Sequence, residues 1–275
     1  MRILQIAPLW ETVPPPAYGG TEAVVSQLVE ALAQRGHDVT LWASGDSRTS
    51  ATLRSSFPRS LRSADDLSDR SPHDWLHLGR AIEDAVRGGY DVVHNHAGEL
   101  ALAFLRAWDL PLVTTMHCNP TPDTLPIWDD APGAYVTISR AQYELTPRFH
   151  RPRYLGHVYN GIDTASFPFS AQKDDYLLFL SRMAEEKAPH LAIEAARRLG
   201  RRIVLAGKVD WRDRPYFERV VAPLLDGDRV TFVGEADARR KRELFGRARA
   251  LLLPLQWAEP FGLVIVEAMA CGTPV

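Results

Sequence analysis

The chain has 275 residues, 45% hydrophobic and 24% charged, a composition typical of globular proteins that excludes intrinsic disorder for most of its length. Its 32 Lys and Arg nearly balance its 34 Asp and Glu, and the formal net charge of −2 gives no support for nucleic-acid binding through bulk charge. The length fits two domains better than one. Two cysteines, Cys118 and Cys271, cannot form a disulfide framework and predict a reducing compartment.

No segment predicts a signal peptide or a transmembrane helix. The N-terminal stretch 1–7 is too short for a signal peptide. The longest apolar run, residues 248–257, contains Arg249 and Pro254 and falls well short of the roughly 20 residues that a spanning helix needs. We therefore expect a soluble, cytoplasmic protein, for which a peripheral membrane contact stays open.

Short apolar runs alternate with amphipathic stretches, a pattern that predicts βα units around a parallel sheet. Strands are predicted at residues 2–7, 39–43, 91–94, 111–116, 134–139 and 154–159. Helices are predicted from Thr21, as the N-cap, to Gly36, at 75–86, at 100–107 and from Arg140. Residues 44–71 are polar and predict a long loop with short helical pieces. Together these elements predict one doubly wound domain, residues 1–167.

A polar segment at residues 168–175 predicts a domain boundary, after which a second α/β series begins. Its predicted strands are 176–181, 202–206, 230–233 and 250–254, and its predicted helices are 189–199, 215–225, 239–247 and 261–270. Residues 272–275 resemble a helix stop followed by the start of another strand. We therefore expect the second domain, residues 168–275, to be incomplete, and this form of the protein to be marginally stable or inactive.

Polar and glycine residues follow most of the predicted strands, at the sheet edge where open parallel sheets bind ligands. In the first domain they are Gly19, Gly20, His94, His96, His117, Ser139, Arg140 and residues 160–163. In the second they are Arg182, Lys187, Gly207, Lys208, Gly234, Glu235 and Glu259. Two sheets that face each other through these edges would enclose a ligand cleft between the domains.

Two of these groups suggest phosphate binding. Arg182 and Lys187 flank a turn between a strand and a helix, where a guanidinium fork and an ammonium suit a diphosphate. The alternative is a solvated charged loop in which Glu185 and Glu186 are the partners. Gly19-Gly20 precedes a helix, whose N-terminal N–H groups can bind phosphate, although such a pair alone is more often a simple turn.

The stretch 259–274 carries the strongest signal. Pro260 is expected to open a helix whose first N–H groups Gly262 leaves accessible. Glu259 and Glu267 are then about 10 Å apart along the axis, too far for a close acid/base pair but suited to two parts of one long ligand. Three apolar residues of this helix are predicted to lie in the core: Val264, Ile265 and Met269.

Two patterns could indicate a metal. His94, His96 and His117 have no clearly spaced acidic partner, so we favour structural or substrate-contacting histidines over a metal site. Asp226-Gly227-Asp228 has an Asp-x-Asp form but lies before a strand, so a tight turn is the preferred interpretation.

The sequence resembles glycosyltransferase family 4, the retaining nucleotide-sugar transferases of GT-B fold, in a series of motifs and in their order along the chain. The resemblance covers the whole chain. It is carried by residues 19–22 (GGTE), 35–39 (RGHDV), 91–96 (DVVHNH), 160–163 (NGID), Arg182 through Lys187, and the two glutamates Glu259 and Glu267 separated by seven residues.

The resemblance implies two α/β domains, of which the N-terminal binds the acceptor and the C-terminal binds the donor, and a second domain that continues past Val275. It implies a role for individual residues as well. Arg182 and Lys187 match the diphosphate-binding cations of the family, and Gly20 matches its glycine loop. Glu259 matches the glutamate near the donor sugar, and Glu267 matches the glutamate at the ribose. Residues 261–263 (Phe261, Gly262, Leu263) match the sugar and phosphate cradle, and His117 matches the histidine near the transferred sugar. With them we place Gly19, Lys208 and Gly234 on the donor side, and His96, Ser139 and Asn160 on the acceptor side.

The leading hypothesis is a retaining transfer of a hexose from a nucleoside diphosphate sugar to a hydroxyl acceptor: a sugar, a lipid-linked sugar or a small molecule. Uridine, as in UDP-glucose, is the default base on the family resemblance alone. No cofactor and no metal are expected, because Arg182, Lys187 and a helix N-terminus can stabilise the charge that grows on the leaving diphosphate. The alternatives are a non-catalytic nucleotide-sugar-binding protein or inactive fragment, and a histidine-based metal hydrolase.

Overall fold

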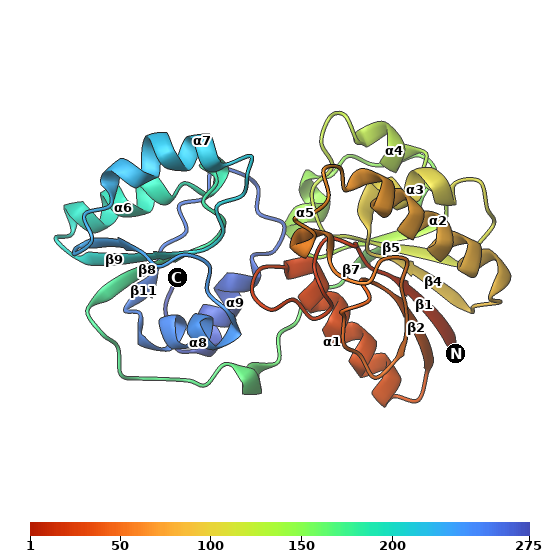
Figure 1. The fold of residues 1–275 in the computed structure, drawn as a ribbon, viewed down its shortest axis with the longest axis horizontal. Helices are drawn as coiled ribbons and strands as arrows, with labels where there is room; N and C mark the ends of the chain where they lie inside the picture. The colour runs from red at the N-terminus through yellow and green to blue at the C-terminus, as the bar shows by residue number, and fades with distance from the viewer. The chain divides into compact units, whose positions relative to one another are not determined.

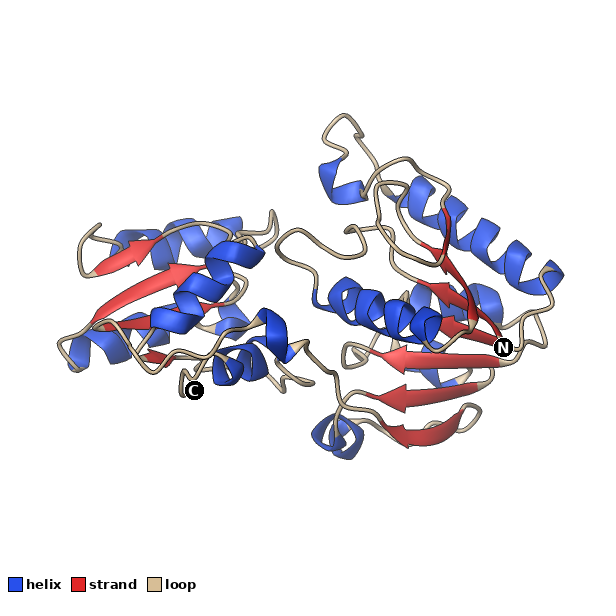
Figure 2. Ribbon diagram, turned by 90° about the horizontal axis from the view of Figure 1, so that it is seen from below, coloured by secondary structure: helices blue, strands red, loops and turns tan.

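The computed structural model describes residues 1–275, which form two compact units (Figure 1). The first unit comprises Met1–Pro15 and Gly19–Asn160, and the second comprises Pro16–Tyr18 and Gly161–Val275. Each unit is an open parallel sheet with helices on both faces, as the alternation of apolar runs and amphipathic stretches predicts (Figure 2).

The sheet of the first unit has seven strands in the order β3-β2-β1-β4-β5-β6-β7. Their bounds are β1 (Arg2–Ile6), β2 (Asp38–Trp42), β3 (Thr52–Arg54), β4 (Val92–Asn95), β5 (Leu112–Met116), β6 (Ala134–Thr137) and β7 (Arg153–His157). All pairs are parallel, and the chain reverses direction across the sheet at β1, between β2 and β4. Such a reversal is where doubly wound folds bind ligands.

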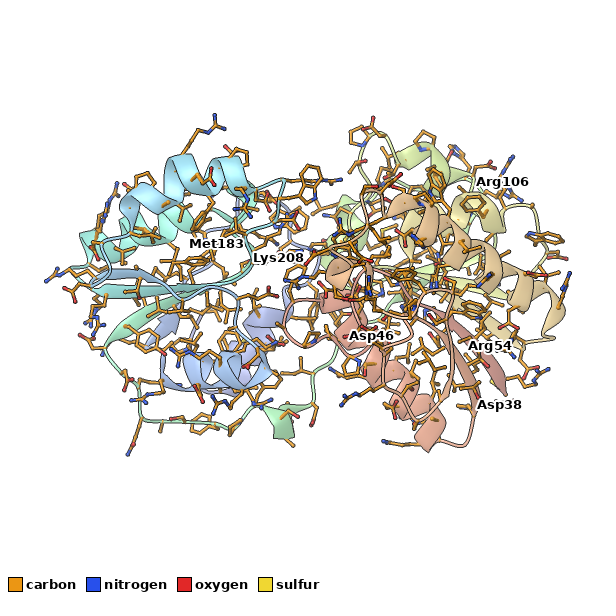
Figure 3. The ribbon with its side chains drawn as sticks, in the orientation of Figure 1. Asp38, Asp46, Arg54, Arg106, Met183 and Lys208 are labelled. Atoms are coloured by element: carbon orange, nitrogen blue, oxygen red, sulfur yellow. The ribbon has the colours of Figure 1, made fainter.

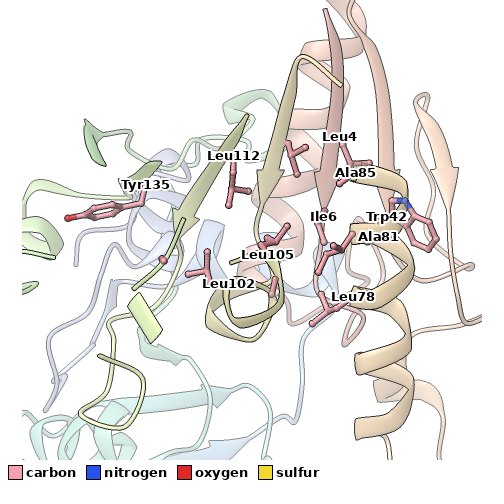
Figure 4. Packing of buried hydrophobic residues seen from close by; sticks show 14 of the residues in the cluster. Leu4, Ile6, Trp42, Leu78, Ala81, Ala85, Leu102, Leu105, Leu112 and Tyr135 are labelled. Atoms are coloured by element: carbon pink, nitrogen blue, oxygen red, sulfur yellow. The ribbon is translucent and has the colours of Figure 1, made fainter. Parts of the chain in front are cut away.

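Helices cover both faces of this sheet. They are α1 (Gly20–Gln34), α2 (Ser71–Arg87), α3 (Gly98–Leu105), α4 (Leu125–Asp129) and α5 (Arg140–Leu145). Leu4 and Ile6 of β1 pack against α2 and α3 on one face (Figure 4), while Val25 and Val29 of α1 join a separate cluster on the other. Burial on both faces explains why these strands are short continuous apolar runs.

The second unit has four parallel strands in the order β10-β9-β8-β11. Its strands are β8 (Tyr176–Leu180), β9 (Arg202–Ala206), β10 (Val230–Phe232) and β11 (Ala250–Leu251), and its longer helices are α6 (Pro189–Arg198), α8 (Ala238–Arg247) and α9 (Leu263–Ala270). Leu177 and Phe179 pack on the α6 face, whereas Leu178 and Leu180 pack on the face of α8 and α9. This alternation is the two-residue period of a strand buried on both sides.

The structure corrects two predictions in the first unit and adds one helix that was not predicted. Thr21 is not an N-cap, because α1 begins at Gly20 and its cap position is Gly19, with no side-chain hydrogen bond. Residues 44–71 include a strand, β3, whose three residues are too few and too exposed to give a sequence signal. The short helix α4 was likewise not predicted, because five residues show no helical period.

Four predictions fail in the second unit. The helix predicted at 215–225 is a single α-turn, α7 (Arg214–Tyr216), followed by a π-helical turn and a 3₁₀ turn. Strand β11 is shorter than predicted, and Pro260 does not open α9, which begins three residues later. Met269 is 62% exposed rather than in the core, because α9 packs on the sheet through Ala268 and its neighbours.

Candidate active site

The strands of the second unit end in loops that carry most of the predicted donor-side residues. Arg182 follows β8 and its guanidinium pairs with Glu186 and, at 3.5 Å, with the carboxylate of Asp213. Burial alone would lower the pKa of Arg182, but Asp213 and Glu186 outweigh it and hold the pKa above its usual range. The cation therefore stays charged in a half-buried position. Glu186 is a partner, as the solvated-loop alternative expects, but Arg182 is not a fully solvated side chain.

Lys187 lies at the end of the same loop and forms an ion pair with Glu259, which follows β11. The two side chains are only 13% and 23% exposed, so solvent screens the pair weakly. Trp257 holds both partners: its ring centroid lies 4.1 Å from Lys187 Nζ, and its Nε1 donates to Glu259 Oε2 at 3.1 Å. Sequence reasoning did not find Trp257, although a tryptophan two residues before a singled-out glutamate was a usable signal.

Lys208 is brought to the same edge by the turn after β9. Gly207 has φ 147°, and a Cβ there would lie 1.8 Å from the carbonyl oxygen of Ser181, so only glycine lets this turn approach the end of β8 so closely. The carbonyl of Lys208 accepts from Met183 N at 2.8 Å, and Figure 3 shows the two residues side by side. Lys208 Nζ pairs with Asp210 at 2.8 Å. Gly234, after β10, accepts from Gly207 N at 2.8 Å and therefore adjoins this turn.

The N-terminus of α9 begins directly after a glycine. Gly262 is the N-cap with φ 78°, a left-handed conformation that other residues adopt only with strain. A Cβ on Gly262 would also lie 2.8 Å from Ile265 Cδ1. Phe261 precedes this cap and Leu263 is the first helical residue, so all three predicted cradle residues sit around the start of the helix. The N–H groups of this first turn carry the partial positive charge that attracts anions.

Glu267, in the middle of α9, is a buried carboxylate with one oxygen occupied and one free. Its side chain is 9% exposed, and Lys241 Nζ of α8 donates to Oε1 at 2.7 Å. Oε2 is buried and has no hydrogen-bond partner. Buried polar atoms are nearly always paired, so Oε2 is one of the few buried polar atoms that the chain itself leaves without a partner. Lys241 was not predicted, because it sits in a run of basic residues and contacts Glu267 only through the fold.

The carboxyl edge of the first unit instead carries three histidines. His94 forms a hydrogen bond with Thr115, in which Nε2 lies 2.8 Å from Oγ1. His96 lies between two partners: its Nδ1 is 2.9 Å from His117 Nε2, and its Nε2 is 2.7 Å from Gln5 Oε1. The His94 and His96 rings have centroids 4.0 Å apart. The three histidines therefore form one cluster, in which His94 belongs to β4 itself and His96 and His117 follow β4 and β5.

Burial keeps these rings neutral. Desolvation lowers the pKa of His94 to about 4 and that of His117 to about 3, and it lowers the pKa of His96 well below its usual range. The neighbouring histidines push in the same direction. The cluster is thus uncharged at neutral pH, and each ring has one N–H donor and one acceptor nitrogen.

The geometry does not support the metal hydrolase alternative. His96 uses both ring nitrogens for Gln5 and His117, and no group of three or more His, Cys, Asp or Glu side chains is placed to hold a metal ion. Asp226-Gly227-Asp228 is a turn, in which Asp226 Oδ1 accepts from the backbone N–H groups of Asp228 and Val230. The tight-turn interpretation of that motif is confirmed.

The remaining first-unit residues occupy varied positions. Gly19 precedes α1 as its N-cap, as predicted, whereas Gly20 is already its first residue. Ser139 caps α5 by accepting from Gln142 N at 3.0 Å, and Asn160 is the half-buried last residue of the unit. His96 is 3% exposed and lies behind His117, so burial leaves it no surface for direct contact with an acceptor.

Comparison with known families identifies the class of protein. The model of Glycosyltransferase Family 4 matches residues 18–166, and that of Glycosyl transferases group 1 matches residues 163–275. The chain belongs to glycosyltransferase family 4. The resemblance predicted from the sequence motifs is therefore confirmed, and with it the prediction that the protein is a glycosyltransferase.

Individual relatives agree with this assignment. The chain is 29% identical over 339 residues to the glycogen synthase of Mycobacterium tuberculosis, covering 100% of this chain and 77% of that protein. It is 29% identical over 302 residues to the phosphatidyl-myo-inositol mannosyltransferase of Mycolicibacterium smegmatis, covering 100% of this chain and 75% of that protein.

Solved structures confirm the fold. The sucrose-phosphate synthase of Thermosynechococcus elongatus matches with a TM-score of 0.76 and 21% identity, covering 100% of this chain and 80% of that one. The predicted GT-B class, with two parallel α/β units of which the second is smaller, is thereby confirmed. None of the helices has the length and apolar character needed to span a bilayer.

Proposed function

We propose that the protein transfers a hexose from a nucleoside diphosphate sugar to a hydroxyl acceptor, with retention of configuration at the anomeric carbon. UDP-glucose is the first donor to test, and a mannose donor the second, since the relatives are named as a glycogen synthase and a mannosyltransferase. The acceptor is a sugar, a lipid-linked sugar or a small molecule.

The second unit is the donor side in this proposal. Arg182, Lys187 and the N-terminus of α9 would face the diphosphate, whose negative charge grows as the glycosidic bond breaks. Lys208 and Gly234 would line the same edge, and Glu259, held by Lys187 and Trp257, would lie near the transferred sugar.

The first unit would bind the acceptor and contact the transferred sugar. His117 is half-buried at the end of β5 and has a neutral ring, which suits hydrogen bonds with sugar hydroxyl groups. Gly19 and Gly20 would approach the diphosphate through backbone N–H groups. Asn160 would contact the acceptor, and Ser139 would shape that side by fixing the start of α5.

The observation that carries the proposal is the free oxygen of Glu267. A ribose presents two adjacent hydroxyl donors, and a buried carboxylate with Oε2 unpaired provides the acceptor that such a donor needs. Lys241 fixes the direction of this carboxylate through its hydrogen bond to Oε1.

The same edge supports a mechanism without a metal. Three cations, Arg182, Lys187 and Lys208, lie at the ends of β8 and β9, and each already has a carboxylate neighbour that a diphosphate can replace or join. Fixed cations of this kind stabilise a leaving diphosphate as a bound metal would.

The test is turnover with a panel of nucleotide sugars in the presence of a chelator. Release of the nucleoside diphosphate and the configuration of the glycosidic product, read by NMR, are the two measurements. We expect one donor to be consumed with retention and without added metal. An inverted product, or turnover only with a divalent cation, would contradict the corresponding part of the proposal.

A further inference from the structure

A chain of hydrogen bonds runs from the interior of the first unit to its ligand edge. Gln5, in the interior strand β1, is fully buried, and its Oε1 lies 2.7 Å from His96 Nε2. His96 Nδ1 in turn lies 2.9 Å from His117 Nε2. The position of His96 is fixed as well, because its backbone N–H donates to Ile6 at 2.9 Å.

The protons along this chain can be counted. A carbonyl oxygen only accepts, so His96 Nε2 donates to Gln5. Both imidazole rings are neutral and carry one N–H each. His96 Nδ1 must therefore accept, and His117 Nε2 must be the donor. This leaves His117 Nδ1 without a proton.

The free nitrogen of His117 faces no partner within the chain. His117 Nδ1 makes no hydrogen bond and is not among the buried unpaired atoms, so it is accessible. His117 directly follows β5, at the carboxyl edge of the sheet. An accessible nitrogen with a lone pair there is an acceptor for a hydroxyl group.

We infer that Gln5 is a positioning residue that acts through His96 to hold His117 in the tautomer with Nε2 protonated, leaving Nδ1 to accept a hydrogen bond from a sugar hydroxyl. The sugar as ligand rests on the proposed function. The tautomer itself does not, because it follows from the side chains alone. The opposite orientation of the Gln5 amide would reverse every bond and make His117 Nδ1 a donor.

The direct test is a long-range ¹H–¹⁵N correlation spectrum of the full chain labelled with ¹⁵N-histidine, which identifies the protonated nitrogen of each ring. Single histidine-to-glutamine variants assign the signals. We expect protons on Nε2 of both His96 and His117. A proton on Nδ1 of His117 would overturn the inference, whether or not the chain turns over a donor.

A matched pair of variants tests the role of Gln5. Gln5→Met keeps the size of the side chain and removes the acceptor. Gln142→Met is the control, since Gln142 is also fully buried in this unit, accepts one hydrogen bond through Oε1 from Ile138 N, and has an unpaired Nε2.

We expect Gln5→Met to give a mixture of His117 tautomers and to lower kcat/KM with UDP-glucose on the order of tenfold to a hundredfold, as misplacing a contacting group does. Gln142→Met should keep the wild-type tautomer of His117. An unchanged His117 tautomer in Gln5→Met, or an equal change in Gln142→Met, would overturn the inference. If the wild type shows no turnover of the donor, the proposed function is contradicted, but the tautomer result is unaffected.

Discussion

The two units place different chemistry at equivalent edges of the same kind of sheet. At the carboxyl edge of the first, His94, His96 and His117 are neutral and linked by hydrogen bonds. At the carboxyl edge of the second unit, Lys187 and Lys208 are paired with carboxylates. The fold alone therefore does not determine what an edge binds, and the side chains that follow each strand do.

The cause of the difference is the balance between desolvation and compensating charge. No carboxylate accompanies the three histidines, so burial removes their charge. Arg182 is also desolvated, but Asp213 and Glu186 keep it charged. We expect a neutral edge to suit sugar hydroxyl groups and an ion-paired edge to suit a diphosphate.

The largest expected effect comes from removing one cation of the second edge. Lys187→Ala should lower kcat/KM for the donor by roughly 10²–10³-fold, because the variant loses charge stabilisation of the leaving group and leaves Glu259 half-buried without its cation. Steady-state kinetics with varied donor measures the change.

Arg198→Ala is the matched control for that variant. Arg198 also forms an ion pair with a glutamate in the second unit, but its side chain is 78% exposed. Its removal should leave the kinetics unchanged, since exposed pairs contribute little. Similar kinetics for the two variants would remove Lys187 from the site.

Glu267→Gln should act on binding. If Oε2 accepts from a ribose hydroxyl, loss of the charge should weaken donor affinity by about 1.5–3 kcal/mol and change kcat less. Glu243→Gln, at a 43% exposed position in α8, is the control and should bind the donor as the wild type does. A Glu267→Gln variant with unaltered affinity would contradict the ribose contact.

Acid should destabilise the first unit through its neutral histidines. His77 is fully buried with its pKa lowered to about 4 from 6.5, chiefly by desolvation. Above pH 6.5 it is neutral in both the folded and unfolded states, so it adds no pH dependence. Between pH 6.5 and 4 only the unfolded chain takes up the proton, so stability falls as the pH falls.

The expected loss is about 2 kcal/mol for such a histidine between pH 7 and pH 5. His94, His96 and His117 act in the same direction. Urea unfolding of the wild type and of His77→Gln at both pH values measures it, and the variant should lose about 2 kcal/mol less. Equal pH dependence in the two would show that His77 is protonated in the folded chain.

The smallest expected effect separates the two contacts of Trp257. Trp257→Phe keeps an aromatic face for Lys187 but removes the N–H that donates to Glu259. We expect kcat/KM to fall by an amount that corresponds to about 1 kcal/mol of transition-state stabilisation, the usual value of one such hydrogen bond. Trp257→Leu also removes the ring and should lose more. Equal kinetics for all three forms would show that Trp257 positions neither partner.

The sequence predicted most of the fold because most elements carry their own signal. Strands such as β8 and β9 are short apolar runs, and α6 begins at a proline, so local pattern and tertiary burial agree. Elements with too few residues escaped, as β3 did. The segment 215–225 was predicted as one regular α-helix, because the π-helical and 3₁₀ turns that it contains do not alter the spacing of its apolar residues.

Prediction of the candidate site was similarly limited to residues with a local signal. Glycines and charges that follow strands were found, whereas Lys241 reaches Glu267 from another helix and Gln5 reaches His96 from another strand. Such partners lie far apart in sequence, and only the packing of the sheet brings them together. Roles for the predicted residues remain expectations that the variants above test.

The most direct test of the donor edge is calorimetric titration of the full chain with UDP in the presence of a chelator, for the wild type, Lys187→Ala and Glu267→Gln. We expect metal-independent binding by the wild type and weaker binding by both variants, since UDP carries the diphosphate and the ribose. Absence of binding without a divalent cation, or equal affinity in all three proteins, would contradict a donor site at Lys187 and Glu267.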